Sequence, residues 1–163
     1  MAGTAVVLIA GPAGAASTPR LAGTWSTKQV VTQSQNGETV GHTTVKPYKF
    51  VPQCSTGACA TVMTRVHGDG SKQTYVINPN KNSTYTGGAT YLGSCYSSNG
   101  GVLIAKGYKY TETLTIHVTK TSAGSASAFT GILTLGFTPT AAGKSKCPQG
   151  SEIVSLTSGK KTG

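Results

Sequence analysis

Residues 111–120 alternate between two kinds of side chain, and this alternation constrains the fold more than any other feature of the chain. The positions between threonine or histidine residues are occupied by Glu112, Leu114, Ile116 and Val118. Successive side chains of a β-strand point to opposite faces, so a period of two is typical of a strand with one packed and one solvated face. Residues 129–137 repeat the pattern, with one face formed by Phe129, Gly131, Leu133, Leu135 and Phe137.

The remainder of the chain has the pattern of further strands separated by turns. We predict these strands near residues 23–34, 40–51, 60–67, 73–78, 84–93, 102–110 and 152–158. Asn36-Gly37 and Asn99-Gly100 are typical of type I′ hairpin turns, which need positive φ at both central residues. Glutamate occurs only three times, which excludes an all-α fold. The predicted fold class is all-β: an antiparallel meander closed into a roughly eight-stranded barrel, with a two-layer β-sandwich as the alternative.

The length of 163 residues fits one domain. The first sixteen residues contain a short apolar run and Ala13-Gly14-Ala15, which has the Ala-x-Ala form of a signal-peptidase site. We therefore expect residues 1–16 to be a signal peptide or a truncated leader, and residues 17–163 to form a single barrel domain. The expected location of the mature protein is extracellular.

The four cysteines agree with export, because an even number of cysteines in an exported chain indicates disulfides. Cys54 and Cys59 flank a turn-like loop, so among the alternative connectivities we expect Cys54–Cys59 and Cys95–Cys147. The spacing differs from that of zinc-binding cysteines, and no histidine follows at the usual interval. We expect no metal site.

Gly23-Thr24-Trp25, on the first predicted strand, resembles the Gly-x-Trp motif of the lipocalins and the wider calycin group. Those proteins are eight-stranded up-and-down barrels, so the resemblance implies a closed calycin-like barrel with Trp25 packed across its floor. In that family a basic residue near the last strand often covers the tryptophan ring; here Lys160 and Lys161 stand in place of the expected arginine. The resemblance implies a lipophilic ligand. Calycins also include secreted metalloprotease inhibitors, so it supports protein binding as well.

Candidate catalytic groups are few. The three histidines are His42, His67 and His117. Asp69 stands two residues after His67, but both fall in a predicted turn, and the chain has no Gly-x-Ser-x-Gly elbow for a nucleophile. The glycine pairs lack the Lys-Ser/Thr that completes a phosphate-binding loop. We expect neither enzyme activity nor a cofactor.

The net charge of +10 comes almost entirely from lysine, since only Arg20 and Arg65 are arginines. Sequence-specific nucleic-acid binding favours arginine, so no specific nucleic-acid partner is expected. Within residues 46–50, Tyr48 and Phe50 share the face that we expect to be packed, and Lys49 takes the other. A basic exported protein attracts anionic envelope polymers. No segment approaches the roughly 20 apolar residues that a transmembrane span needs.

Glu112 is the one acidic residue that we expect to point into the barrel, where it needs a basic partner; Arg65 and Lys106 are candidates. We expect an exported, non-enzymatic β-barrel domain that binds a small ligand or a component of the bacterial envelope. The expected ligand contacts are Trp25, Tyr48, Arg65, Tyr75, Tyr108, Tyr110 and Glu112. The alternative is a protein-interaction module, such as a secreted protease inhibitor or an extracytoplasmic sensor domain. An open interior would favour the ligand, and a solid interior would favour the interaction role.

Overall fold

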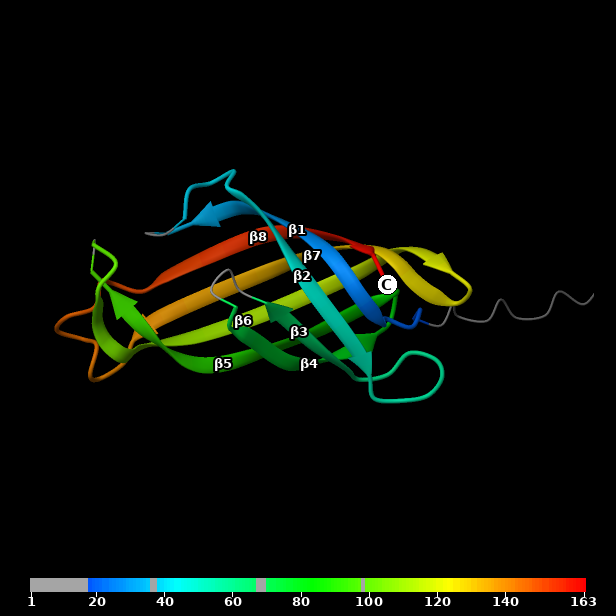
Figure 1. Ribbon diagram of the computed structural model, residues 1–163, viewed down its shortest axis with the longest axis horizontal. Coiled ribbons are helices and arrows are strands. Elements are labelled where there is room, and N and C mark those ends of the chain that lie inside the picture. The colour runs from blue at the N-terminus through cyan, green and yellow to red at the C-terminus, as the bar shows by residue number, and fades with distance from the viewer. Residues whose placement is uncertain (1–17, 36–37, 67–69, 98) are drawn as a thin grey trace, which may run out of the picture.

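The computed structural model describes residues 18–35, 38–66, 70–97 and 99–163, and the predicted leader lies outside these ranges. The described residues form one closed antiparallel sheet, in which every strand pairs with its neighbours in sequence and the last strand pairs with the first (Figure 1). The strands are β1 (Gly23–Ser34), β2 (Thr43–Pro52), β3 (Thr61–Val66), β4 (Lys72–Asn80), β5 (Thr84–Tyr96), β6 (Val102–Ser122), β7 (Ser125–Pro139) and β8 (Ser151–Lys161). The predicted all-β meander closed into an eight-stranded barrel is confirmed. Its strand order is consistent with a calycin-like barrel, and the chain does not form the alternative sandwich.

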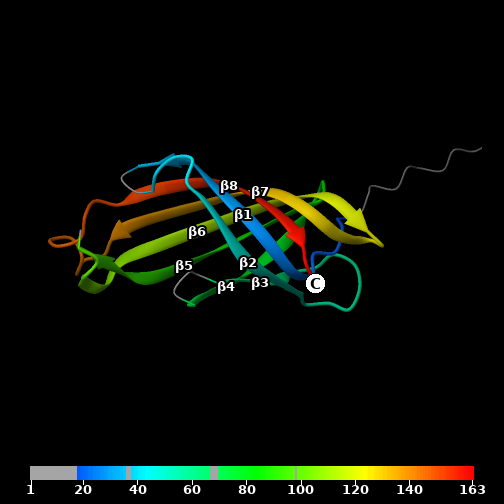
Figure 2. The ribbon, with the colours of Figure 1, turned by 45° about the horizontal axis from the view of Figure 1, so that its top comes forward.

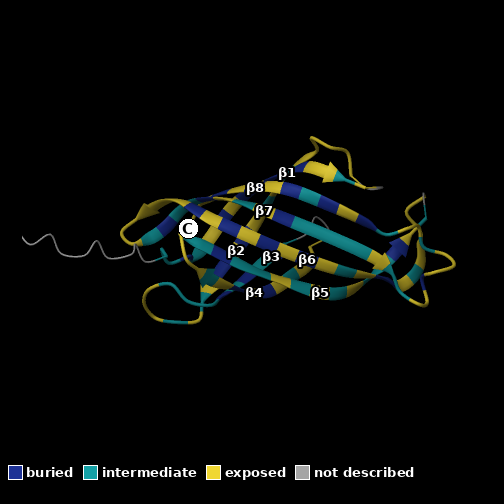
Figure 3. Ribbon diagram, turned by 180° about the vertical axis from the view of Figure 1, so that it is seen from behind, coloured by how far each residue is buried: buried dark blue, intermediate teal, exposed yellow. Residues whose placement is uncertain are grey.

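Burial follows the alternation that the sequence predicts, and buried and exposed residues succeed one another along the strands in Figure 3. On β6, Glu112, Leu114, Ile116 and Val118 are buried, whereas the residues between them are exposed. The prediction of separate strands over residues 102–110 and 111–120 was wrong, because β6 is continuous over 21 residues. Its inward face continues without interruption from Tyr108 through Tyr110 to Glu112, so nothing in the backbone requires a break there.

The turns differ in part from the prediction. Ala123 and Gly124 join β6 to β7 and have φ values of 47° and 75°, the two positive values that a type I′ turn needs. Asn99-Gly100 lies in the hairpin that joins β5 to β6, as predicted, and Gly100 has a positive φ of 78°. The Gly100 amide donates to the Ser97 carbonyl, and the Ser97 amide donates to the Gly101 carbonyl, which makes a longer loop. The Asn36-Gly37 pair lies outside the described residues.

Both predicted disulfides are confirmed. Cys54 and Cys59 close the loop between β2 and β3, and Cys95 on β5 is joined to Cys147 in the segment between β7 and β8. The first bridge lies at the end of the barrel where β1 begins, and the second lies at the opposite end. Each end of the barrel therefore has one loop fixed by a disulfide.

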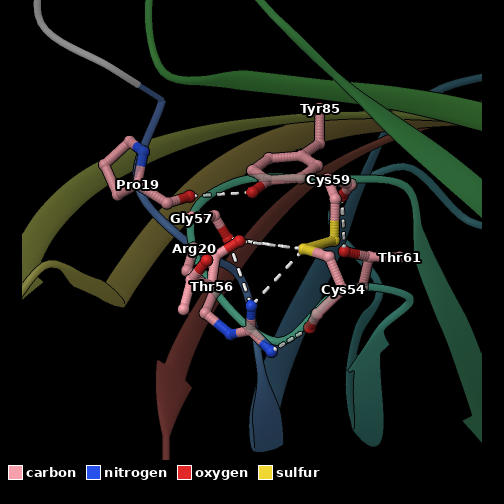
Figure 4. Close-up of a disulfide and its surroundings, with 8 residues drawn as sticks. All are labelled: Pro19, Arg20, Cys54, Thr56, Gly57, Cys59, Thr61 and Tyr85. Atoms are coloured by element: carbon pink, nitrogen blue, oxygen red, sulfur yellow. Dashed lines mark hydrogen bonds between the residues drawn. A yellow bond between two sulfur atoms is a disulfide. The ribbon is translucent and has the colours of Figure 1, made fainter.

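The end of the barrel where β1 begins is closed by the chain that precedes β1 (Figure 4). The Arg20 guanidinium donates to the carbonyl of Cys54 at 2.6 Å and to that of Gly57 at 3.3 Å. The Tyr85 hydroxyl donates to the carbonyl of Pro19 at 2.8 Å. Leu21 is fully buried. These contacts hold residues 18–22 across this end of the barrel, so that this segment covers the end.

Aromatic rings fill the interior next to residues 18–22. Trp25 is fully buried, with its ring centroid 5.9 Å from that of Phe50 and 5.1 Å from that of Phe129. Its indole N–H donates to the Ala22 carbonyl at 3.1 Å. A Cβ atom at Gly159 would lie 2.3 Å from the Phe129 ring, so this position has room only for glycine. The closed half of the barrel is therefore packed with side chains.

The opposite end is uneven because β3 and β4 are short. Among the described residues, β2 pairs with β3 only from Tyr48 to Pro52, and β4 pairs with β5 only from Ile77 to Asn80. The preceding part of β2 and most of β5 extend beyond these pairs. Figures 1 and 2 show β5 to β8 continuing well past β3 and β4. Among the described residues, β3 and β4 therefore form the shortest part of the barrel wall.

Candidate ligand-binding site

The open half of the barrel contains a cavity of about 170 Å³. One part of its lining is polar and comes from Gln29, Thr44, Lys46, Arg65 and Ser155, with Glu38 from the loop after β1. The other part is apolar and comes from Val31, Tyr91, Leu133, Leu135 and Ile153. Leu135 lies opposite Ile153 and Leu133 lies opposite Ser155, so β7 and β8 supply one continuous wall that is apolar except at Ser155.

Arg65 and Glu112 form a buried ion pair on the polar side of the interior. Their side chains are 4% and 0% exposed, and the guanidinium donates to the carboxylate at 2.5 Å. Burial has the largest single effect and disfavours the Arg65 cation, but Glu112 and the tyrosines Tyr48, Tyr75 and Tyr91 together outweigh it and raise the pKa of Arg65. Glu112 is therefore the counter-charge that allows a guanidinium inside the barrel. The Nε–H of Arg65 is buried and has no hydrogen-bond partner among the described residues.

Two tyrosines complete this polar layer. The Tyr75 hydroxyl donates to Glu112 at 2.9 Å, so both carboxylate oxygens are engaged. The Gln29 amide donates to the Tyr48 hydroxyl at 2.8 Å. Burial raises the pKa of Tyr48 to about 12. Burial, and then the charge of Glu112, raises the pKa of Tyr75, so both phenols are neutral donors or acceptors at neutral pH.

Lys46 brings a second positive charge into the cavity. It shares the inward face of β2 with Tyr48 and Phe50 and is half-buried. Burial, and then repulsion from Arg65, lowers the pKa of Lys46. Among the described residues it has no carboxylate within salt-bridge distance, since Glu112 pairs with Arg65 and Glu38 pairs with His42 at 3.2 Å. Lys46 is therefore the one cation of the cavity lining without a direct counter-charge in the described part of the chain.

Tyr91 gives the cavity an aromatic surface held by further rings. Tyr91 and Tyr110 are stacked, with centroids 5.2 Å apart and an interplanar angle of 8°. Tyr110 packs against Phe137 and Tyr108, and the Tyr108 hydroxyl donates to the Pro148 carbonyl at 3.0 Å. This cluster extends from the cavity to the loop fixed by Cys147.

The residues expected to contact a ligand fall into three places. Arg65 lines the cavity, and Glu112, Tyr75 and Tyr48 support it through the polar layer. Tyr110 stands behind Tyr91, and Tyr108 lies farther toward the rim. Trp25 lies at the closed end, outside the cavity lining.

Sequence reasoning missed Lys46 and Gln29. Lys46 is spaced by two from Tyr48 and by four from Phe50, so the same alternation places it on the inward face, whereas Lys49 lies outside as expected. Gln29 likewise lies two residues after Thr27 and four after Trp25, so it shares their inward face. Of the two candidate partners of Glu112, Arg65 forms the ion pair and Lys106 is exposed. The period of two was the signal that could have found both missed residues.

Among the described residues, no group of three or more histidine, cysteine, aspartate or glutamate side chains lies close enough to hold a metal ion. His117 is exposed, His42 contacts Glu38, and His67 and Asp69 lie outside the described ranges. Within those ranges no helix has both the length and the apolar character required to cross a membrane.

The comparisons with known proteins leave the cavity itself as the basis for assigning a function. No family model matches the chain, and no curated protein matches it.

Proposed function

We propose that this protein is an exported, non-enzymatic β-barrel domain that binds a small ligand in the open half of its interior. The observation that carries the proposal is the cavity of about 170 Å³, which Arg65 and Lys46 line together with apolar side chains. Binding sites of small molecules are concave and combine apolar walls with polar groups in fixed positions. This cavity combines five apolar or aromatic lining residues with six polar ones, so its polar share is larger than is usual. An eight-stranded barrel has room inside for side chains or for one small ligand.

The division of the interior into a packed half and an open half supports a ligand over the alternatives. Lys46 has no carboxylate within salt-bridge distance among the described residues, so a ligand with a polar end would give this half-buried cation a partner. A cavity of this volume is too small for a polymer chain of the envelope. An interaction module of the kind weighed from the sequence would need no such space. Two disulfides support an oxidising, extracellular environment.

Filling the cavity tests the proposal. Ser155 lines it from β8, and Ser158 on the same strand is exposed on the outer face. We expect small ring-sized compounds to shift amide NMR signals of the wild-type protein around the cavity. Ser155→Phe should abolish these shifts, because the new ring occupies the space, and Ser158→Phe should preserve them.

Circular dichroism and the unfolding midpoint establish that each variant is folded before its binding is compared. If Ser155→Phe does not fold, the proposal is tested by mapping which amide NMR signals of the wild-type protein the compounds shift. Shifts confined to the lining residues support the proposal. Shifts confined to the outer face, or equal binding by both phenylalanine variants, would overturn it.

A further inference from the structure

We infer that the ligand is a monocarboxylate with an apolar body about the size of one aromatic ring, and that Lys46 and Arg65 bind its carboxylate. This inference rests on the proposed function, since it names the chemistry of the ligand that the cavity accepts. Its three grounds are the size of the cavity, the separation of polar from apolar lining, and the balance of charge.

Size limits the ligand first. The cavity measures about 170 Å³. An engineered apolar cavity of about 150 Å³ in another protein binds benzene, so this one holds one ring or a short branched chain. A long acyl chain, a nucleotide or a peptide would extend far beyond it.

The lining fixes the direction in which such a ligand lies. Lys46 and Arg65 come from the adjacent strands β2 and β3, where Tyr48 pairs with Arg65. Leu135 comes from β7, which lies across the closed eight-stranded barrel from β3, and Ile153 comes from the neighbouring strand β8. A ligand that satisfies both walls has a polar end toward the two cations and an apolar end toward the leucine and isoleucine. Tyr91, held flat against Tyr110, provides a rigid surface on which a ring can stack.

Charge decides the nature of the polar end. Glu112 already neutralises Arg65 and engages both of its oxygens, which leaves Lys46 as the one lining cation without a carboxylate within salt-bridge distance among the described residues. Burial, and then Arg65, lowers the pKa of Lys46, because both disfavour its positive charge. One negative charge with two acceptor oxygens matches these groups. A dianion such as a phosphate monoester would add a charge that Glu38 and Glu112 repel.

Calorimetry with benzoate as the probe, and with neutral benzamide of nearly the same shape, tests the inference. Wild-type protein should bind benzoate at least about tenfold more tightly than benzamide, because hydrogen bonds to charged groups are worth more than a factor of ten. Lys46→Met should remove this preference and leave benzamide affinity within about twofold, since methionine retains the apolar stem but loses the charge. Lys49→Met on the outer face of the same strand is the matched control and should behave as wild type.

The outcomes separate the two proposals. If benzamide binds as tightly as benzoate, or if Lys46→Met retains the preference for benzoate, the carboxylate inference is overturned and the ligand-binding cavity stands. If neither compound binds, the inference fails. The proposed function is then tested by the NMR experiment with other ring-sized compounds and the Ser155→Phe variant. If Lys46→Met does not fold, NMR of the wild-type lysine side chains replaces it. Benzoate should shift the Lys46 signal and not that of Lys49, and the reverse would overturn the inference.

Discussion

Glu112 is the residue on which the interior of this barrel depends most. It is 1% exposed, pairs with Arg65 and accepts a hydrogen bond from Tyr75. Glu112→Gln keeps the size of the side chain but leaves the buried guanidinium without a counter-charge. We expect the free energy of unfolding to fall by about 3–5 kcal/mol, the usual cost of breaking one side of a buried ion pair. Urea unfolding followed by circular dichroism measures this change.

The control for this prediction is Glu152→Gln, which makes the same substitution at an exposed position of β8. It should change the free energy of unfolding by no more than about 0.5 kcal/mol. The double variant Arg65→Met/Glu112→Leu removes both charges and should recover most of the loss. A Glu112→Gln protein as stable as Glu152→Gln would contradict the assignment of Glu112 as the essential counter-charge.

At the scale of elements, the two disulfides differ in how much chain they constrain. Cys95 and Cys147 are separated by 52 residues, whereas Cys54 and Cys59 are separated by five. In the chain-entropy model the longer loop contributes ~4 kcal/mol and the shorter loop ~2 kcal/mol. We therefore expect Cys95→Ala/Cys147→Ala to lower the free energy of unfolding about twice as much as Cys54→Ala/Cys59→Ala. Chemical denaturation of the two variants under identical conditions makes the comparison.

Equal losses, or a larger loss from the short loop, would show that local contacts outweigh chain entropy here. The Arg20 contacts with Cys54 and Gly57 offer a check on that outcome. Arg20→Ala removes those hydrogen bonds while leaving the disulfide intact, so the change in the free energy of unfolding measures the contribution of the hydrogen bonds separately.

The strand pattern also shows which elements sequence reasoning can supply. Alternation places Glu112, Leu114 and Ile116 of β6 inside correctly, and the same rule applied to β2 would have placed Lys46 inside. The Arg65–Glu112 contact is different, because β3 and β6 are not paired neighbours. Only closure of the barrel brings these two residues together, so the sequence offered Lys106 as an equal candidate. The cavity is lined by residues of several strands and of the loop after β1, so it depends on tertiary packing that the alternation of single strands does not specify.

For the whole molecule, the buried tyrosines couple stability to alkaline pH. Burial raises the pKa of Tyr48 from 10.0 to about 12, and burial with Glu112 raises that of Tyr91 to about 12. The unfolded chain ionises these phenols near pH 10, whereas the folded barrel keeps them neutral. The contribution of these neutral phenols to the free energy of unfolding is therefore complete below pH 10 and is lost as the pH rises to about 12.

We expect the free energy of unfolding to decrease steadily over this interval, and tyrosinate absorbance to rise together with the loss of circular dichroism. Tyr48→Phe should make the decrease less steep, because one of the coupled phenols is gone. A free energy of unfolding that stays constant from pH 10 to about pH 12 would contradict the burial of these hydroxyls.

The claim that the open half of the barrel is a site for one small ligand is tested most directly by a crystal structure obtained with bromobenzoate, whose bromine can be located by anomalous scattering. We predict a bromine position inside the barrel, with the carboxylate at Lys46 and Arg65 and the ring between Tyr91 and the wall formed by Leu135 and Ile153. A cavity filled by the protein's own side chains, or bromine found only on the outer surface, would contradict the account.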